Sequence, residues 1–315
     1  MILIDADALS ATLDPRILVE ALRAGHLGEV PAVERLYLPE PGAENDLLVW
    51  SGWRRREGVV VKAATVFPGN AATGRQNIHS VALLFDGEAG APLAVIHGEA
   101  FTRMKTAADS ALAADLLARP DCETLTLIGA GGQAETHARF LLAMRPTIRR
   151  VTICNRTPAR AEAVAARLGV LGIEAETSAD VETAVRRADI LSCLTASAVP
   201  VFEGDWLAPG AHVDLVGGFT PQMREADDTA IRRARLFADT RRFTLDTCGD
   251  FAQAIAAGAM TRDGVAADLF ELAEDPARGR RGAEEITLFK NGGGGHLDLM
   301  AARALFDLAA SSAGR

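Results

Sequence analysis

The feature that constrains the fold most is a glycine-rich turn between a short apolar strand and a helix. A strand is expected at 124–128, the sequence Gly129-Ala-Gly131-Gly-Gln-Ala134 follows at once, and 133–144 has the period of a helix. In such a unit the first glycine permits a tight turn and the second lets a phosphate approach the backbone. The small third residue allows the helix to pack on the strand. The turn therefore predicts dinucleotide binding.

The segments after this turn continue the same alternation of strand and helix. Strands are expected at 150–154, 189–194, 211–216 and 236–238, with helices at 158–168, 181–188 and 228–234. Such alternation is typical of a parallel, doubly wound sheet. We expect an α/β protein whose dinucleotide-binding, Rossmann-type domain covers residues 119–289.

The N-terminal part has a different pattern. Strands expected at 47–50, 59–63 and 80–85 follow one another across turns without helices between them, which favours an antiparallel sheet. Helices are expected at 18–27 and 102–118. A strand at 286–290, a glycine run and a helix from about His296 bring the chain back, so a discontinuous mixed α/β domain should comprise 1–118 and 290–315.

The end of the second expected strand bears on which dinucleotide is bound. Sites that prefer NAD usually place an acidic residue there for the ribose 2′-hydroxyl. This chain has Asn155-Arg156-Thr157 instead, with Arg160 and Arg139 nearby in sequence, which favours NADP(H) while leaving NAD(H) possible. The alternative for Arg156 is a solvated surface residue. The predicted cofactor-binding residues are Gly129, Gly131, Gly132, Gln133, Ala134, Asn155, Arg156, Thr157, Thr195 and Gly217.

Lysine is rare in this chain. Of the 33 basic residues only Lys62, Lys105 and Lys290 are lysines. A lysine pKa can be lowered until the side chain gives up its proton, whereas arginine stays charged near neutrality. We therefore regard the lysines as candidates for a role that arginine cannot fill, the alternative being chance.

Composition excludes several classes of partner. The formal net charge of −9 disfavours nucleic acid. No apolar stretch reaches the roughly 18 residues that span a bilayer, and residues 1–7 lack the basic start of a secretory signal. The four cysteines form no CxxC pair, so we expect no metal site, but buried thiols in a reducing, cytoplasmic compartment.

Several segments, in order along the whole chain, resemble the ornithine cyclodeaminase/μ-crystallin family. They are Val61-Lys-Ala-Ala-Thr-Val-Phe-Pro-Gly-Asn70, Leu83-Leu-Phe-Asp86, Thr102-Arg-Met-Lys-Thr-Ala-Ala-Asp-Ser-Ala111, Leu127-Ile-Gly-Ala-Gly-Gly-Gln-Ala134 and Glu285-Ile-Thr-Leu-Phe-Lys290. The resemblance implies a homodimer with a substrate-binding and dimerisation domain beside the Rossmann domain. Members include cyclodeaminases, an alanine dehydrogenase and reductases of cyclic ketimine acids.

The resemblance also implies roles for single residues. Lys62 matches the family's active-site lysine, and Lys105 stands where most members have an arginine that binds the substrate carboxylate. Arg35 approximately matches a second carboxylate-binding arginine. Asn70 is either a turn residue or a substrate contact. Lys290 is expected at a strand end, where a surface charge is the favoured interpretation.

Two departures from the family pattern bear on activity. Cyclodeaminases carry an aspartate just after a Gly-Gly pair, where Gly217-Gly218 is here followed by Phe219, as in the pyrroline-carboxylate reductases. In addition, Asn291 is followed by four glycines and His296, where members usually show Ser-x-Gly and then an acidic residue. The resemblance therefore implies an NAD(P)H-dependent oxidoreductase that converts Δ1-pyrroline-2-carboxylate to L-proline, and possibly Δ1-piperideine-2-carboxylate to L-pipecolate. The alternatives are an ornithine cyclodeaminase or amino-acid dehydrogenase, or a μ-crystallin-like NADP-regulated binding protein.

Reducing a cyclic imino acid requires a cation for its carboxylate and a proton for its nitrogen. The hydride comes from the cofactor, so the protein needs no nucleophile. Arg35 and Lys105 are the predicted carboxylate ligands. Lys62 is the first choice as proton donor because nearby cations and burial lower a lysine pKa, and His296 is the alternative.

Overall fold

The computed structural model describes residues 1–73 and 75–313, which form two compact units. Unit 1 contains Met1–Lys105 with the C-terminal segment from Gly293, and unit 2 contains Thr106–Gly292. The units divide within one helix and within the glycine run. The folding domains expected from the sequence, 1–118 with 290–315 and 119–289, remain a prediction. Each unit is described below by itself.

Unit 1 is built on a six-stranded sheet in the order β1-β6-β5-β4-β3-β2. All neighbours are antiparallel except β1 and β6, as the absence of helices between the strands predicted. The strands are β1 (Ile2–Asp5), β2 (Ala32–Pro39), β3 (Asp46–Arg54), β4 (Gly58–Val66), β5 (Ile78–Phe85) and β6 (Pro92–His97), and a 3₁₀ turn, η1 (Pro68–Thr73), precedes β5. The first strand leads directly into a helix.

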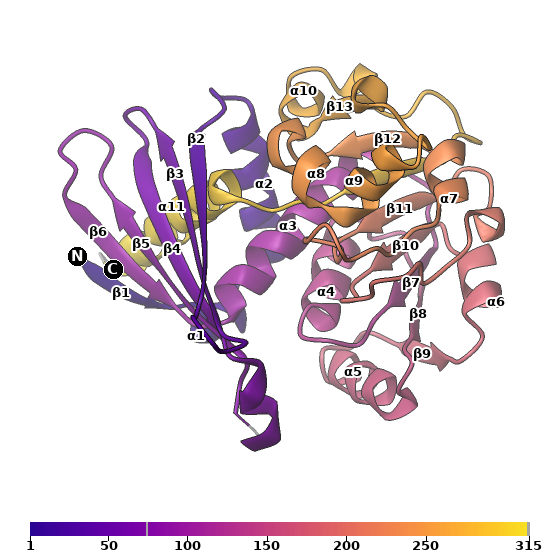
Figure 1. Ribbon diagram of the computed structural model, residues 1–315, viewed down its shortest axis with the longest axis horizontal. Coiled ribbons are helices and arrows are strands. Elements are labelled where there is room, and N and C mark those ends of the chain that lie inside the picture. The colour runs from indigo at the N-terminus through magenta and orange to yellow at the C-terminus, as the bar shows by residue number, and fades with distance from the viewer. Residues whose placement is uncertain (74, 314–315) are drawn as a thin grey trace. The chain divides into compact units, whose positions relative to one another are not determined.

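One face of this sheet is covered by the last helix, α11 (Gly295–Ala313), which crosses β2 to β5 (Figure 1). Helix α2 (Pro15–His26) packs on α11, and α1 (Ala6–Ser10) follows β1. Side chains alternate between the two sheet faces. Val60, Lys62 and Ala64 are therefore buried on one face, whereas Val59, Val61 and Ala63 are only half-buried on the other.

Unit 2 contains an eight-stranded parallel sheet in the order β13-β12-β14-β11-β10-β7-β8-β9. The strands are β7 (Thr124–Ile128), β8 (Arg150–Cys154), β9 (Ala175–Ser178), β10 (Ile190–Cys193), β11 (His212–Leu215), β12 (Arg235–Ala238), β13 (Val265–Asp268) and β14 (Thr287–Lys290). Chain order reverses at β7, with β8 on one side and β10 on the other. This is the doubly wound, Rossmann-type arrangement that the sequence predicted.

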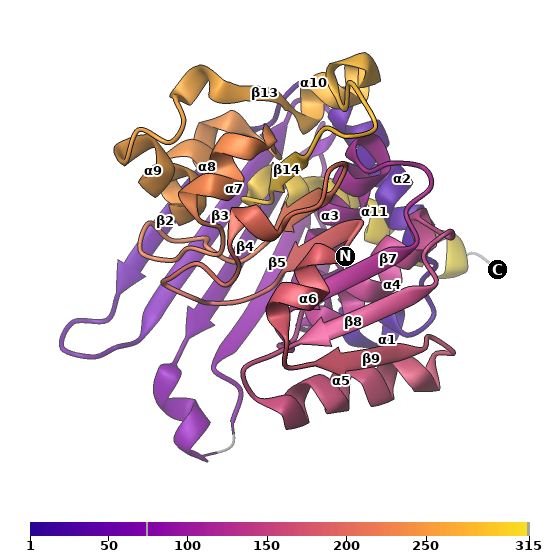
Figure 2. The ribbon, with the colours of Figure 1, turned by 90° about the vertical axis from the view of Figure 1, so that its right-hand side faces the viewer.

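Helices connect these strands. They are the end of α3 (Ala100–Leu117), α4 (Ala134–Met144), α5 (Pro158–Val170), α6 (Val181–Arg186), α7 (Asp228–Arg233), α8 (Arg241–Thr247), α9 (Gly249–Ala256) and α10 (Leu269–Glu274). Figure 2 shows β7, β8 and β9 side by side, with α5 packed along β8 and β9. A large apolar cluster lies in the interior of the unit, with Leu191, Val213 and Leu288 on neighbouring central strands completely buried.

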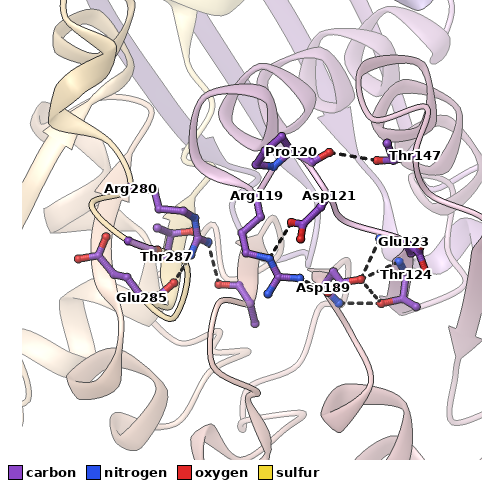
Figure 3. Close-up of polar contacts among 12 residues, drawn as sticks. Arg119, Pro120, Asp121, Glu123, Thr124, Thr147, Asp189, Arg280, Glu285 and Thr287 are labelled. Atoms are coloured by element: carbon purple, nitrogen blue, oxygen red, sulfur yellow. Dashed lines mark hydrogen bonds and ion pairs between the residues drawn. The ribbon is translucent and has the colours of Figure 1, made fainter.

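The amino ends of these strands are joined by a polar cluster (Figure 3). The Asp189 carboxylate accepts bonds from the backbone N–H groups of Glu123 and Thr124 and from the Thr124 hydroxyl, at 2.8–3.0 Å, and pairs with Arg119 at 2.7 Å. These bonds hold the Asp189 pKa low despite its burial, which opposes them. The cluster ties the starts of β7 and β10 together, at the sheet edge opposite the glycine turn.

The structure adds elements that periodicity did not show. Strands β2, β6, β9 and β13 and helices α8, α9 and α10 were not expected. Thr157 occupies the N-cap position of α5, but its side chain makes no capping hydrogen bond. All four cysteines are free and buried, as expected. Among the described residues no helix combines the length and apolarity needed to cross a bilayer, and no three potential metal ligands gather.

Candidate functional site

The predicted cofactor residues lie at one edge of unit 2. In a parallel sheet all carboxyl ends share an edge, and Gly129, Asn155, Thr195 and Gly217 come within two residues of the ends of β7, β8, β10 and β11. The chain reverses between β7 and β10, and doubly wound folds bind ligands outside the carboxyl ends at such a switch point. There Leu194 N–H donates to the Ile128 carbonyl at 2.8 Å.

The two glycines of the turn differ in what they require. Gly129 has φ of +114°, and a Cβ there would lie 2.8 Å from the Leu194 carbonyl oxygen, so the fold alone demands glycine. At Gly131 a Cβ would meet no atom of residues 1–73 and 75–313 within 4 Å. Protein packing therefore leaves the second glycine unexplained. A pyrophosphate approaching the backbone at the start of α4 would explain it.

Asn155 is already engaged within the turn. Its Oδ1 accepts the Ala130 N–H at 3.2 Å, and its Nδ2 donates to the Thr157 carbonyl at 2.9 Å. Asn155 thus ties the end of β8 to the glycine turn. Arg156 and Thr157 are exposed beside it, and Gly131, Gly132 and Gln133 are accessible while Ala134 is buried.

In unit 1, a row of paired residues carries the candidate substrate groups. Arg35 on β2 pairs with Trp50 on β3, which pairs with Lys62 on β4. All three therefore lie on the sheet face that α11 covers. The Lys62 ammonium lies 4.7 Å from the centre of a Trp50 ring and only 5% of the residue is accessible, whereas Arg35 is exposed at the edge strand. Arg35 and Lys62 are separated by two strand spacings, roughly 10 Å between backbones.

Lys62 and Lys105 share one buried carboxylate. The Asp298 Oδ1 lies 2.9 Å from the Lys62 Nζ and 3.3 Å from the Lys105 Nζ, and Asp298 is fully buried on α11. Lys105 reaches this point from α3. We refer to Lys62, Asp298 and Lys105 as the two-lysine cluster. Its net charge is +1 when both lysines are protonated.

The cluster sets the protonation of Lys62. Burial lowers the pKa of Lys62 to about 8, with Asp298 opposing that shift and the nearby Lys105 adding to it. Burial alone would raise the pKa of Asp298, but Lys105 and Lys62 outweigh it and keep the carboxyl ionised. Lys62 is therefore a cation near neutrality that can release its proton within the physiological range.

His296 lies at the start of α11 next to this cluster. Its ring meets the His26 ring edge-on at a centroid distance of 6.2 Å, and 1% of the residue is accessible. Burial, His26, Lys105 and Arg54 together hold the His296 pKa well below its usual range. The imidazole is thus neutral at pH 7, which weakens it as a proton donor relative to Lys62.

Asn70 lies in the 3₁₀ turn after β4. Its side-chain Nδ2 donates to the Gln76 carbonyl at 2.8 Å, which links η1 to the residues just before β5. This bond is consistent with the interpretation of Asn70 as a turn residue.

Comparison with known proteins places this arrangement in a family. Residues 9–313 match the ornithine cyclodeaminase/mu-crystallin family. The chain belongs to that family. It is 43% identical over 286 residues to the Δ1-pyrroline-2-carboxylate reductase of Paracoccus denitrificans, covering 90% of this chain and 89% of that one.

Solved structures agree with this assignment to the ornithine cyclodeaminase/mu-crystallin family. The Thermococcus litoralis Δ1-pyrroline-2-carboxylate reductase, in complex with NADH and L-proline, superposes with a TM-score of 0.92 at 28% identity, covering 99% of this chain and 98% of that one. A probable ornithine cyclodeaminase from Bordetella pertussis has a TM-score of 0.87 at 30% identity, with 100% and 98% covered.

The glycine run, one of the two departures from the family pattern, has a packing explanation. A Cβ at Gly295 would lie 2.1 Å from the Ser51 carbonyl oxygen, and one at Gly52 would lie 2.2 Å from the Gly295 oxygen. Gly293 and Gly294 have positive φ. The chain therefore enters α11 in direct backbone contact with β3, close to the Lys62 row. Phe219, the other departure, is 54% accessible at the carboxyl edge of unit 2.

Asp298 was not predicted from the sequence. It lies 236 residues from Lys62 and two residues beyond His296, in a helix that is otherwise apolar around it. One signal was present, since a lone carboxylate on the buried face of a helix demands a cationic partner.

Removing the Asp298 charge should destabilise the protein strongly. Asp298→Asn leaves two buried ammonium groups without a counter-charge, so we expect the free energy of unfolding to fall by about 3 kcal/mol. Urea unfolding followed by tryptophan fluorescence measures this. Adding Lys105→Met should recover part of the loss because one of the two charges is removed.

Asp307→Asn is the matched control. Asp307 lies on the same helix, and its side chain is 56% accessible and paired with Arg303. Its removal should cost less than about 0.5 kcal/mol. Equal effects of the Asp298 and Asp307 substitutions would contradict the assigned charge balance.

Proposed function

We propose that this protein is an NAD(P)H-dependent reductase of cyclic ketimine acids that converts Δ1-pyrroline-2-carboxylate to L-proline. The observation that carries the proposal is the two-lysine cluster, which offers positive charge and a transferable proton in one buried place. The similarity to reductases of this substrate supports the choice of ring. The six-membered homologue, Δ1-piperideine-2-carboxylate, fits the same chemistry.

The roles follow from charge and protonation. Lys105, and Arg35 from the edge strand, bind the substrate carboxylate, and Lys62 donates its proton to the ring nitrogen as the carbon beside it gains a hydride. A bound dihydronicotinamide supplies that hydride. The neutral His296 packs beside the cluster and keeps water away from it. The apolar ring of Phe219 offers no base for the amine chemistry of a cyclodeaminase.

We assign the cofactor to the carboxyl edge of unit 2, with the phosphates at Gly129–Ala134. NADP(H) is the preferred form because Arg156 is exposed at the end of β8, where no carboxylate competes for the ribose. Arg156→Gln should then raise the KM for NADPH by about tenfold and leave that for NADH unchanged. Arg167→Gln, on the exposed side of α5, is the control.

The activity test is a panel of imino acids with each cofactor. We expect oxidation of NADPH, and more slowly of NADH, with Δ1-pyrroline-2-carboxylate, and no ammonia from L-ornithine. Lys62→Met should lower kcat by at least about 100-fold because the proton donor is lost. Lys62→Arg should rescue little, since arginine does not release its proton near neutrality.

The pH dependence of kcat/KM tests the role of Lys62 as the acid. Lys62 must be protonated to act as the acid, so kcat/KM should fall as pH rises through about 8. Turnover of ornithine with ammonia release, or full activity in Lys62→Met, would contradict the proposed reaction.

A homodimer is the second part of the proposal. The sheet face of unit 1 opposite Lys62 exposes large apolar side chains, among them Leu36 at 52%, Trp53 at 62% and Leu83 at 37%. Uncovered apolar faces of this kind mark interfaces, and a second copy supplies a matching apolar face. Light scattering should give twice the chain mass of 33.2 kDa, and Leu83→Glu should lower it. A monomeric wild type would contradict the dimer.

A further inference from the structure

A second buried charge cluster lies behind the cofactor edge of unit 2. Glu225 is completely buried in the loop between β11 and α7. Its Oε1 accepts the backbone N–H of Thr195 at 2.6 Å and the Thr195 hydroxyl at 2.8 Å. Thr195 follows β10 at the switch point, so one carboxylate oxygen fixes both the backbone and the side chain of a predicted cofactor contact.

The same carboxylate lies against Gly217. A Cβ on Gly217 would lie 1.9 Å from the Thr195 carbonyl oxygen and 2.6 Å from the Glu225 Cδ. The backbones after β10 and β11 are therefore in direct contact, with Glu225 packed on both. Moving or removing this carboxylate changes the support of Thr195 and Gly217 together.

Lys290 and Asp250 hold the Glu225 loop in place. Lys290, at the end of β14, donates to the carbonyls of Leu215 and Gly217 and lies 3.2 Å from the Asp250 Oδ2. It is completely buried, so the expected surface charge was wrong. Asp250, on α9, accepts the backbone N–H groups of Glu225 at 2.7 Å and Ala226 at 3.1 Å.

One ammonium thus faces two buried carboxylates. The Glu225 Oε2 has no hydrogen-bond partner among residues 1–73 and 75–313. Asp214 on β11, the Cys193 thiol on β10 and the Cys248 thiol before α9 are titratable groups that share this charge environment. The negative charge of Glu225 is therefore only partly balanced, because Asp250 shares the same ammonium group.

We propose that Glu225 is a positioning residue for the nicotinamide cofactor, acting through Thr195 and Gly217. The inference rests on the proposed function, because it takes these two residues to be cofactor contacts. Glu225 itself touches neither cofactor nor substrate in this account. The charge-assisted bonds from its ionised carboxylate hold the two backbones where the cofactor needs them.

The positioning should depend on pH. Burial raises the pKa of Glu225 to about 7, with Asp250 adding to the shift and Lys290 and the Thr195 bonds opposing it. Protonation replaces a charged acceptor by a neutral one, and bonds to neutral acceptors are weaker. Cofactor affinity should therefore decline as pH falls through about 7. Burial raises the Asp214 pKa to about 6, but Asp214 bonds Ser110 and Ser192 and not the two backbones.

Direct cofactor titration tests the proposal. The dissociation constants of NADPH and NADH are measured by nucleotide fluorescence from pH 5.5 to 8.5 for the wild type, Glu225→Gln and Glu225→Ala. Glu225→Ala should bind about tenfold more weakly at pH 8, since it leaves the buried Thr195 donors unpaired. Glu225→Gln keeps an acceptor oxygen, so its affinity should stay within about threefold of wild type and lose the change near pH 7.

Asp189→Asn is the matched control at the opposite edge of the same sheet. It should lower the melting temperature without altering either dissociation constant, which separates positioning from general stability. Unchanged cofactor affinity in Glu225→Ala, or a wild-type pH dependence in Glu225→Gln, would overturn the proposal. A wild type that binds neither nucleotide would instead overturn the proposed function.

Discussion

The arrangement of unit 1 depends on the pairing of one carboxylate with two ammonium groups. Burying a charge is costly unless a partner compensates it. Asp298 meets that condition for Lys62 and Lys105 at 2.9 and 3.3 Å, and the remaining positive charge is what an anionic substrate requires. The covering helix α11 delivers the carboxylate, and the glycines before it allow backbone contact with β3. The start of α11 therefore both packs against the sheet and carries the carboxylate that pairs with the two lysines.

All three lysines of the chain occupy buried ion pairs with aspartates. Lys62 and Lys105 pair with Asp298, and Lys290 pairs with Asp250, whereas arginine supplies most exposed cations. A compact ammonium on a flexible stem fits these places better than a planar guanidinium. The rarity of lysine in the sequence thus marked two separate clusters. We assign one to the substrate and the other to the support of the cofactor edge.

The sequence predicted unit 2 well because its signals are local. A few adjacent residues are enough to predict the Gly129–Ala134 turn, the strand at 150–154 and the start of α5 at its proline. Strand β2 was not predicted because its last six residues are exposed and give no alternating pattern. Strand β13 and helices α8, α9 and α10, between β12 and β14, are too short for a clear period.

The candidate site was only half predictable. Lys62, Lys105 and Arg35 came from the family resemblance, but nothing in sequence joined them to Asp298, which lies on the last helix. Glu225 lies six residues after Phe219, yet its role depends on Thr195, 30 residues away. Contacts of this kind arise from strand order and helix packing, which periodicity alone does not give. The predicted roles of Asn70 and His296 remain predictions, with Asn70 engaged in its turn and His296 neutral.

The rarity of lysine also makes the central claim directly measurable. Protein labelled with ¹³C at the lysine ε-carbon should give three resolved NMR signals per chain, which substitution of each lysine assigns. The account predicts that the Lys62 signal titrates near pH 8. It also predicts that L-proline, added to protein already saturated with cofactor, shifts the Lys62 and Lys105 signals but not that of Lys290. A Lys62 signal that titrates only above pH 10 and does not respond to L-proline would contradict it.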